Sequence, residues 1–271
     1  MQLDDVVISK AIIERYFTKL NAALEIEVAL VGGGPSNLVC GILLGMAGIR
    51  TVLFESKLAP GGGMWGGGMM FNEIVIQESA LSLLDKVGIK ARPYDMGYYT
   101  ADSIEVSSTL ISRCVRAGTQ IMNMMKVEDV MFREENGEKR INGLVLQWSP
   151  VNQQRLHVDP LTIRAKYAVD GTGHPAEICA MIANKMGAAL RTKTGGLVGE
   201  LPMWAERGES QTIENAVEVF PGLFVTGMAA NATMGAPRMG PVFGGMLLSG
   251  EKVANTLIKL LSTKQTAKNA Y

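Results

Sequence analysis

The sequence is poor in the residues that form covalent cross-links. Its three cysteines, Cys40, Cys114 and Cys179, include no Cys-x-x-Cys pair. Each lies in an apolar or helical context, so we expect small buried side chains rather than disulfides. The 271-residue chain is 47% hydrophobic, which is enough apolar material for a large core without disulfides. Only two histidines are present, His157 and His174, so their positions are informative.

The chain also lacks the patterns of nucleic-acid-binding and membrane proteins. Acidic and basic residues are equal in number, 26 of each. The sequence shows no basic face, so it predicts neither nucleic acid nor a membrane as a partner. No apolar run is long enough to span a bilayer. The N-terminus carries Asp4 and Asp5 and lacks the apolar region of a signal peptide. We therefore expect a cytoplasmic protein.

The strongest pattern runs from residue 26 to residue 55. A short apolar run ends in Gly32-Gly33-Gly34, a helical pattern follows, and a β-branched run ends in Glu55. This is the order of a dinucleotide-binding unit, in which backbone N–H groups face a pyrophosphate and the acid accepts hydrogen bonds from ribose hydroxyls. Asn37 stands where the motif has its third glycine. Because that glycine serves close helix–strand packing, we expect a looser contact here.

The rest of the chain predicts an α/β fold. Predicted helices cover residues 4–24, 77–88, 103–117, 176–186 and 244–261, and predicted strands cover 120–123, 127–132, 141–148, 162–169 and the segment before Gly227; residues 91–100 are extended, and 149–160, 191–210 and 231–245 are loops. A turn signal at 135–137 indicates a β-meander inserted between α/β units. We predict a Rossmann-like dinucleotide-binding fold of the flavoprotein two-dinucleotide-binding type, with residues 1–271 in one domain. The N-terminal helix is expected to pack beside the sheet.

Two further glycine segments bear on the ligand. Residues 60–69 place six glycines around Trp65. Flexible linkers lack such a central tryptophan, so we interpret this segment as a loop that brings its backbone close to a ligand. Near the C-terminus, flavoproteins of this fold usually carry Gly-Asp, whose carboxylate holds the flavin ribityl chain. This chain has Gly227-Met228, and the thioether of methionine is a poor acceptor, which argues against FAD.

Three polar residues and one arginine are candidates for chemistry. His157 and Asp159 lie in a polar loop and His174 follows a strand end; imidazole and carboxylate together suit divalent iron, manganese or zinc. In the alternative, His174 hydrogen-bonds a backbone carbonyl and Asp159 caps the turn at Pro160. This alternative has weight because two protein ligands make a sparse metal site, which a bound substrate would have to complete. Arg238 lies in an apolar loop, where it is either a bidentate clamp for a carboxylate or a surface arginine.

Five motifs span nearly the whole chain. They are VGGGPS at 31–36, PGGGMWGGGM at 60–69, HVDP at 157–160, DGTGH at 170–174 and APRMGPVFGGM at 236–246. In these motifs and in their order the chain resembles the thiamine thiazole synthase family, in its archaeal form. The resemblance implies synthesis of the thiazole half of thiamine, as an adenylated thiazole carboxylate. The implied substrates are NAD, which releases nicotinamide, glycine and a sulfur source.

The same resemblance implies roles for individual residues. Those implied to contact NAD are Ser36, Glu55, Ser56, Gly63, Val127 and Met228. Asp159 and His174 are implied to hold Fe(II), with Asp159 reaching from a neighbouring subunit of a homo-octamer. Arg238 is implied to bind the carboxylate of the substrate glycine.

The residue at position 157 bears on the source of sulfur. In eukaryotic relatives a cysteine at this position donates its own sulfur, and those proteins work once. His157 therefore implies a sulfide-using, multiple-turnover form, in which the imidazole moves protons. Two rival functions stay open: an FAD-dependent oxidoreductase of the same fold, and a nucleotide-binding protein without turnover.

Overall fold

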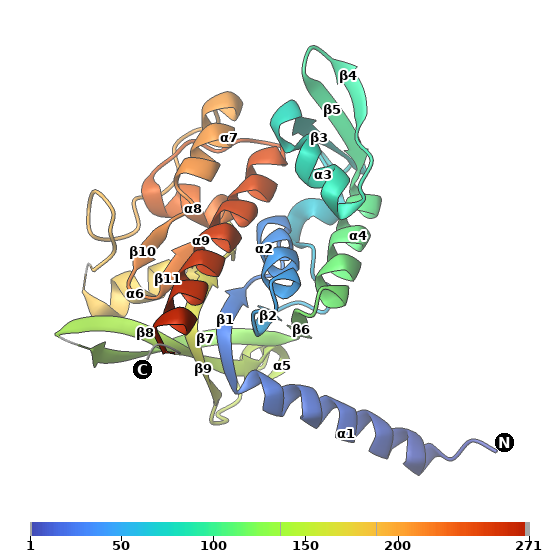
Figure 1. Ribbon diagram of the computed structural model, residues 1–271, viewed down its shortest axis with the longest axis vertical. Coiled ribbons are helices and arrows are strands. Elements are labelled where there is room, and N and C mark those ends of the chain that lie inside the picture. Colours follow the sequence, from blue (N-terminus) through green and yellow to red (C-terminus); the bar gives the residue numbers. More distant parts are fainter. Residues whose placement is uncertain (1, 136, 188, 269–271) are drawn as a thin grey trace.

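The computed structural model describes residues 2–135, 137–187 and 189–268 (Figure 1). Its centre is a sheet of eight strands, counted over these residues, whose main path runs in the order β10-β11-β9-β1-β2-β6. The strands of this path are β1 (Glu25–Val31), β2 (Thr51–Glu55), β6 (Gln120–Asn123), β9 (Leu161–Asp170), β10 (Glu218–Phe220) and β11 (Leu223–Val225). The predicted α/β fold class is confirmed.

The middle of the sheet is parallel. Strand β1 pairs in parallel with β2 and β9, and β11 pairs in parallel with β9. Val31 is in register with Phe54 and Asp170, and Val225 is in register with Asp170. The carboxyl ends of four strands therefore meet at one edge, which is where open α/β sheets bind their ligands.

The predicted β-meander is present. Strand β7 (Met125–Glu135) pairs antiparallel with β8 (Glu138–Trp148), and β8 pairs antiparallel with β9. The two long strands lie across the lower end of the molecule in Figure 1. They join the central sheet through β9, so the insert extends this sheet and shares its core.

Helices cover both faces of the central sheet, and each face has its own core. The helices α2 (Pro35–Met46), α4 (Ser103–Arg116) and α9 (Gly244–Lys268) contribute Leu38, Leu110 and Leu257 to one core. Helix α6 (Glu177–Met186) contributes Ile178 and Ile182 to the other, together with residues of β8. Strands β1 and β2 are buried along almost their whole length, as expected for parallel strands covered on both faces.

A second sheet of three antiparallel strands corrects part of the prediction. Its order is β3-β5-β4, with β3 (Glu73–Gln77), β4 (Arg92–Asp95) and β5 (Tyr98–Asp102). The extended segment 91–100 is therefore a hairpin. The helix predicted from residue 77 begins later, because β3 runs to Gln77 and a 3-10 turn, η2 (Glu78–Ala80), precedes α3 (Leu81–Val87).

Three short helices lie wholly or partly in segments that were predicted as loops. They are α5 (Ser149–Gln153), α7 (Ala205–Glu214) and α8 (Gly227–Met234). The buried face of α7 consists of Gly208, Glu209 and Thr212, so it has no apolar stripe for a periodicity argument to detect. The 3-10 turn η1 (Gly62–Gly66) lies in the predicted glycine loop.

The N-terminal helix forms as predicted. Helix α1 (Asp5–Ala23) is capped by Asp4, whose carboxylate accepts hydrogen bonds from the N–H groups of Val6 and Val7.

Only the C-terminal part of α1 packs as predicted. Ala23 is buried in the core on one face of the sheet, and Tyr16 and Leu20 are partly buried against it. Other apolar side chains, including Ile12 and Phe17, are exposed, and Figure 1 shows the helix projecting from the body of the molecule.

The cysteines follow the prediction. Cys40, Cys114 and Cys179 are free and buried. Burial raises the pKa of each thiol, to about 12 for Cys114. Such thiols are inert, since the thiolate is the reactive form. Across the part of the chain that the structure describes, no helix has both the length and the apolarity needed to cross a bilayer.

Candidate functional site

A cavity of about 530 Å³ opens at the carboxyl edge of the parallel strands. This volume lies within the range of about 300–1,000 Å³ that is usual for ligand pockets. The sequence-predicted residues that line it are Ser36, Glu55, Ser56, Gly63, Val127, His174, Met228 and Arg238. Segments from seven parts of the chain thus meet where the sheet topology places a ligand. Lys57, Lys126, Thr172 and Glu177 also line this cavity, and sequence reasoning did not select them.

The first glycine turn is held against the ends of β2 and β9. Gly32 has φ +87°, and a Cβ there would lie 2.7 Å from the carbonyl oxygen of Gly171, so no other residue fits. The N–H of Gly33 donates to Oε2 of Glu55 at 2.7 Å, and Oε1 accepts the N–H of Lys57 at 2.8 Å. This places a largely buried carboxylate beside the turn. Oε1 also accepts the hydroxyl of Ser56 at 3.3 Å, whereas Oε2 keeps capacity for a further hydrogen bond, such as one from a ribose hydroxyl.

Asn37 tightens the turn that it was expected to loosen. Its amide nitrogen donates to the carbonyls of Val31 at 2.9 Å and Gly32 at 3.0 Å, and its oxygen accepts from Oγ1 of Thr226 at 2.8 Å. The side chain is fully buried. It therefore ties the end of β1 to the residue after β11, and the expectation of looser packing is wrong.

The glycine-rich loop closes over the same turn. The N–H of Gly61 donates to the carbonyl of Gly33 at 2.7 Å, and the indole N–H of Trp65 donates to the carbonyl of Pro60 at 2.7 Å. The tryptophan thus fixes the loop internally, and Met64 is fully buried beneath it. Gly62 and Gly63 line the cavity with backbone, which is consistent with the interpretation of this segment as a loop that approaches a ligand.

Asp170 shapes the turn that carries His174. Its Oδ1 accepts from the backbone N–H and the hydroxyl of Thr172, and its Oδ2 accepts from the N–H groups of Ile178 and Cys179 at 3.0 Å each. The carboxylate is fully buried at the first turn of α6. Every oxygen is satisfied within the chain, so the role of Asp170 is to position the turn.

His174 faces a carboxylate that sequence reasoning missed. Its Nδ1 lies 2.8 Å from both carboxylate oxygens of Glu200. The side chain of His174 is 50% exposed and that of Glu200 only 15%. The alternative in which His174 hydrogen-bonds a backbone carbonyl is not what the structure records for Nδ1. Glu200 lies in the irregular loop 191–204, where no motif or period marks it.

Arg238 reaches the cavity from a segment with fixed backbone. Its N–H donates to the carbonyl of Leu201 at 3.2 Å, and its own carbonyl accepts the N–H of Trp204 at 3.0 Å. The neighbours Pro237 and Met239 are buried, whereas Arg238 is exposed and lines the cavity. Its guanidinium makes no hydrogen bond or ion pair with any residue that the structure describes. An anion in the cavity would therefore meet an unpaired guanidinium.

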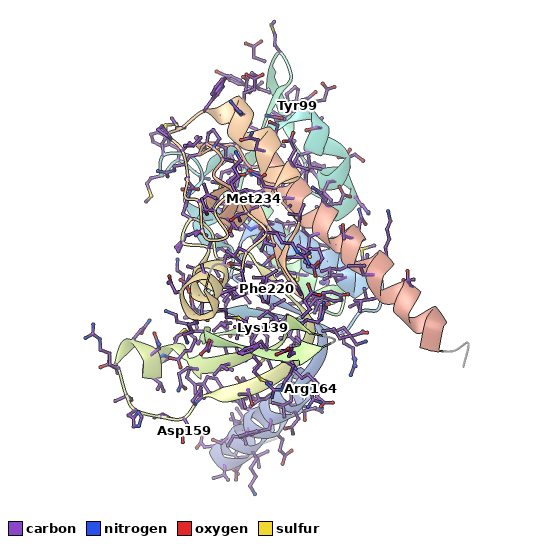
Figure 2. All side chains as sticks on the ribbon, turned by 90° about the vertical axis from the view of Figure 1, so that its left-hand side faces the viewer. Tyr99, Lys139, Asp159, Arg164, Phe220 and Met234 are labelled. Carbon is purple, nitrogen blue, oxygen red and sulfur yellow. The ribbon has the colours of Figure 1, made fainter. Side chains whose placement is uncertain are left out.

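His157 and Asp159 do not line this cavity. Both are exposed, and Figure 2 shows Asp159 on the outlying loop between α5 and β9. Asp159 instead lines a smaller hollow of about 230 Å³ beside Trp148 and Leu161. One chain thus does not bring Asp159 and His174 into one cavity. Over the described ranges, no group of three or more His, Cys, Asp or Glu side chains is arranged to hold a metal ion.

The topology and the first turn define the class of protein. A parallel sheet, a glycine turn at the N-terminus of α2, an acid at the end of β2 and a β-meander before β9 are the parts of the Rossmann-like fold found in flavoprotein-type enzymes. The class alone does not fix the reaction, because function depends on the residues of the site.

Comparison with known proteins identifies the family. The model of the Thi4 family matches residues 9–243. The thiamine thiazole synthases of Methanothermobacter thermautotrophicus and Desulfosudis oleivorans are 53% and 55% identical to this chain, each over 96% of it and 100% of the relative. The crystal structure of Thermovibrio ammonificans THI4 matches with a TM-score of 0.95 at 50% identity, covering 96% of this chain and 100% of that one. The chain belongs to the Thi4 family.

Proposed function

We propose that this protein synthesises the thiazole moiety of thiamine from NAD, glycine and free sulfide, in an Fe(II)-dependent, multiple-turnover reaction that releases nicotinamide. The relatives named thiamine thiazole synthase, aligned over nearly the whole chain, support thiazole synthesis. The observation that carries the finer proposal is the joint placement of Glu55, His174 and Arg238 in one cavity. These three side chains suit a ribose, a metal and a carboxylate.

The nucleotide end of the cavity, defined here as residues 32–36 with Glu55 and Ser56, is suited to NAD. Helix α2 begins at Gly34 with Pro35 in its first turn, and no side chain caps it, so its N-terminal N–H groups are available to a pyrophosphate. Ser36 and Gly63 add a hydroxyl and a backbone edge. Val127 and Met228 offer apolar contacts to the bases of the nucleotide.

The metal end of the cavity is defined here as His174 and Arg238, which line it, together with Glu200, which contacts His174. These side chains are suited to the proposed chemistry. Glu200 contacts Nδ1 of His174, which leaves the lone pair of Nε2 available to a metal ion. An imidazole ligand fits Fe(II), manganese or zinc. When bound, the metal supplies a Lewis acid and a template for the reacting groups. Arg238 binds the glycine carboxylate as a bidentate partner and so orients its amine. This pair of roles requires both side chains in one cavity, and both line it.

The second protein ligand, Asp159, comes from a neighbouring subunit in this proposal. Asp159 is exposed and does not line the cavity of its own chain. The loop of Asp159 would also bring His157 to the reaction, where the imidazole moves protons. The exposed apolar side chains of α1, such as Val7 and Phe17, suit burial against another copy. A cytoplasmic homo-octamer with shared sites is part of the proposal.

Sulfide enters from solution in this scheme. None of the cysteines lines the cavity, and all are buried in the cores. His157 stands where a sulfur-donating relative has cysteine, and an imidazole has no sulfur to give. Met228 lines the cavity where flavoproteins usually carry the ribityl-binding aspartate, which disfavours the FAD-dependent alternative.

Anaerobic turnover with defined reagents tests the proposal. The purified protein, NAD, glycine, sulfide and Fe(II) should give nicotinamide and an adenylated thiazole carboxylate, detected by liquid chromatography and mass spectrometry. Omission of any one reagent should stop thiazole formation. Nicotinamide release with no thiazole under all conditions would contradict the proposal. Flavin absorbance in the purified protein would favour the oxidoreductase, and NAD binding with neither product would favour the non-catalytic alternative.

A further inference from the structure

The contact between His174 and Glu200 joins a movable side chain to a fixed one. Both carboxylate oxygens of Glu200 lie 2.8 Å from Nδ1. Glu200 is largely buried while the imidazole is half exposed, so the carboxylate sets the position and the ring follows it. A carboxylate can only accept a hydrogen bond here, and Nδ1 must then carry the proton.

The backbone on both sides of Glu200 is anchored. The N–H groups of Val198 and Gly199 donate to the carbonyls of Thr233 and Ala232 at 3.2 and 2.9 Å, and the N–H of Leu201 donates to the carbonyl of Ala236 at 3.0 Å. These acceptors lie in and just after the last turn of α8. The backbone of this irregular loop is thus hydrogen-bonded to the end of α8 on both sides of Glu200.

The same loop is paired with the segment of Arg238. Leu201 forms a parallel bridge with Pro237, and the N–H of Arg238 donates to the carbonyl of Leu201. Glu200 therefore belongs to a strip of backbone that sets the position of both the imidazole and the guanidinium. On the other side, the turn of His174 is fixed by the buried carboxylate of Asp170.

We propose that Glu200 is a positioning residue that holds His174 in the Nδ1–H tautomer and so presents the Nε2 lone pair to the metal. A carboxylate on the far side of a metal-binding imidazole fixes the ring orientation and raises its basicity, and loss of such a partner typically costs about 10–100-fold in metal affinity. The metal role rests on the proposed function. The tautomer does not, because it is a property of the metal-free protein.

Two Glu200 variants and one control separate the parts of the proposal. Glu200→Ala removes the acceptor, whereas Glu200→Gln keeps an amide oxygen that can accept from Nδ1–H but loses the charge. Glu206→Gln is the matched control, because Glu206 is an exposed carboxylate in the first turn of the neighbouring helix α7. Thermal unfolding and NAD binding establish that each variant is folded.

The first measurement is the tautomer of His174. The chain has two histidines, so magic-angle-spinning ¹⁵N spectra of histidine-labelled, metal-free protein contain two rings, and a His157→Asn variant assigns them. At about pH 8.5, where an ordinary imidazole is neutral, we expect His174 protonated at Nδ1 in the wild type, the control and Glu200→Gln. We expect the Nε2–H form, which an unconstrained histidine side chain prefers, to become substantial in Glu200→Ala.

The second measurement is Fe(II) affinity by anaerobic equilibrium dialysis, with NAD and glycine present. We expect a loss of about 10–100-fold in Glu200→Ala, a smaller loss in Glu200→Gln, and none in Glu206→Gln. An Nε2–H His174 in the wild type, or an unchanged tautomer in Glu200→Ala, would overturn the proposal. So would equal, complete loss of Fe(II) in both Glu200 variants, since Glu200 would then itself be a ligand. If the wild type makes no thiazole while the tautomer depends on Glu200, the proposed function fails and the positioning role stands.

Discussion

The two ends of the cavity differ in how far a single chain completes them. At the nucleotide end, Asn37 and Glu55 are buried and hydrogen-bonded to backbone, as is the carboxylate of Asp170 beside them. At the metal end, His174 and Arg238 are exposed, and Asp159 is elsewhere. The comparison shows that a single chain completes the hydrogen bonds of the proposed nucleotide end. The chemistry, as we propose it, needs groups that arrive from outside the chain.

This difference follows from the groups that each end uses. Backbone N–H groups and glycines recognise a pyrophosphate, and the parallel sheet positions them with no flexible side chain to order. A metal and a carboxylate substrate require charged side chains, which are costly to bury before the partner charge is present. The guanidinium of Arg238 therefore stays exposed in the free chain.

The largest effect is expected from the two proposed metal ligands. Asp159→Ala and His174→Ala should each abolish iron-dependent thiazole formation and leave NAD binding largely intact, because the glycine turn is elsewhere. The measurement is product by mass spectrometry beside NAD affinity by calorimetry. Near wild-type thiazole formation in either variant would remove that residue from the metal site.

Mixed assemblies of these two variants test the division of the site between chains. If Asp159 reaches a neighbour's cavity, assemblies formed by co-expression contain some sites with both native ligands, and part of the activity returns. If both ligands act within one chain, every site lacks one of them. Activity no higher than that of the separate variants would then contradict the shared site.

A change of Asn37, at the nucleotide end, is expected to lower the stability of the folded protein. Asn37→Ala removes three hydrogen bonds, two of them buried, and leaves the Val31 carbonyl and the Thr226 hydroxyl without this partner. We expect the free energy of unfolding to fall by about 2–4 kcal/mol, measured by urea denaturation. Asn37→Gly restores the third glycine of the motif and should be destabilised as well. A native-like Asn37→Gly variant would show that the amide is not what closes this turn.

The same comparison explains what the sequence could predict. Gly32, Glu55 and the flanking strands lie in one continuous segment with a recognisable period, so the fold class and the nucleotide end were accessible. The contacts of Asn37 with Thr226 and of His174 with Glu200 join segments that only the tertiary fold brings together. Helix α7 was missed because its buried face is polar, and the packing of α1 was predicted only in part because side chains such as Ile12 and Phe17 are exposed.

The next effect is expected from a buried acid, Glu209, and concerns the pH dependence of stability. Glu209 is buried against the start of α9, where one oxygen accepts the N–H of Gly245 and the other has no partner among the described residues. Burial raises the pKa of Glu209 from 4.5 to about 7. Between these two values the unfolded chain has released its proton and the folded chain has not. Stability should therefore fall as pH rises through this window, by about 3 kcal/mol in all.

Glu209→Gln isolates this contribution. Its amide oxygen can still accept from Gly245, and it does not titrate. The difference in unfolding free energy between wild type and Glu209→Gln should shift in favour of the variant as pH rises from about 4.5 to about 7, and then level off. A difference that stays constant over this window would mean that Glu209 is not held protonated by burial.

Arg238→Gln tests the carboxylate role at the metal end. Loss of a charge-assisted bidentate contact should cost about 1.5–3 kcal/mol, which at its upper limit is roughly a hundredfold in glycine use. Release of nicotinamide from NAD should be affected less. The glycine dependence of thiazole formation measures this, with Lys193→Gln, an exposed cation of the nearby loop, as control. Unchanged glycine dependence would leave Arg238 as a surface arginine.

The smallest effect is expected from substitution of the cysteines. It concerns the source of the sulfur, which we propose is sulfide from solution. A protein that donates its own sulfur needs an accessible thiol at the ligand. Cys40, Cys114 and Cys179 are all buried in the two cores and outside the cavity, and burial raises the pKa of each thiol. A variant with all three changed to alanine should therefore still form thiazole over many turnovers when sulfide and Fe(II) are supplied without oxygen. Its stability should fall modestly, because small cavities replace the sulfur atoms.

The mass of the wild-type protein provides the matching observation. After turnover it should be unchanged, with no cysteine converted to dehydroalanine, because the sulfur of the product comes from solution. A cysteine-free protein that folds and binds NAD yet makes no thiazole would contradict an external sulfur source. Thiazole formed without added sulfide, in an amount equal to the protein, would contradict it equally. Either result would mean that the protein itself supplies the sulfur. The metal end would then need one external group fewer, and one difference between the two ends of the cavity would disappear.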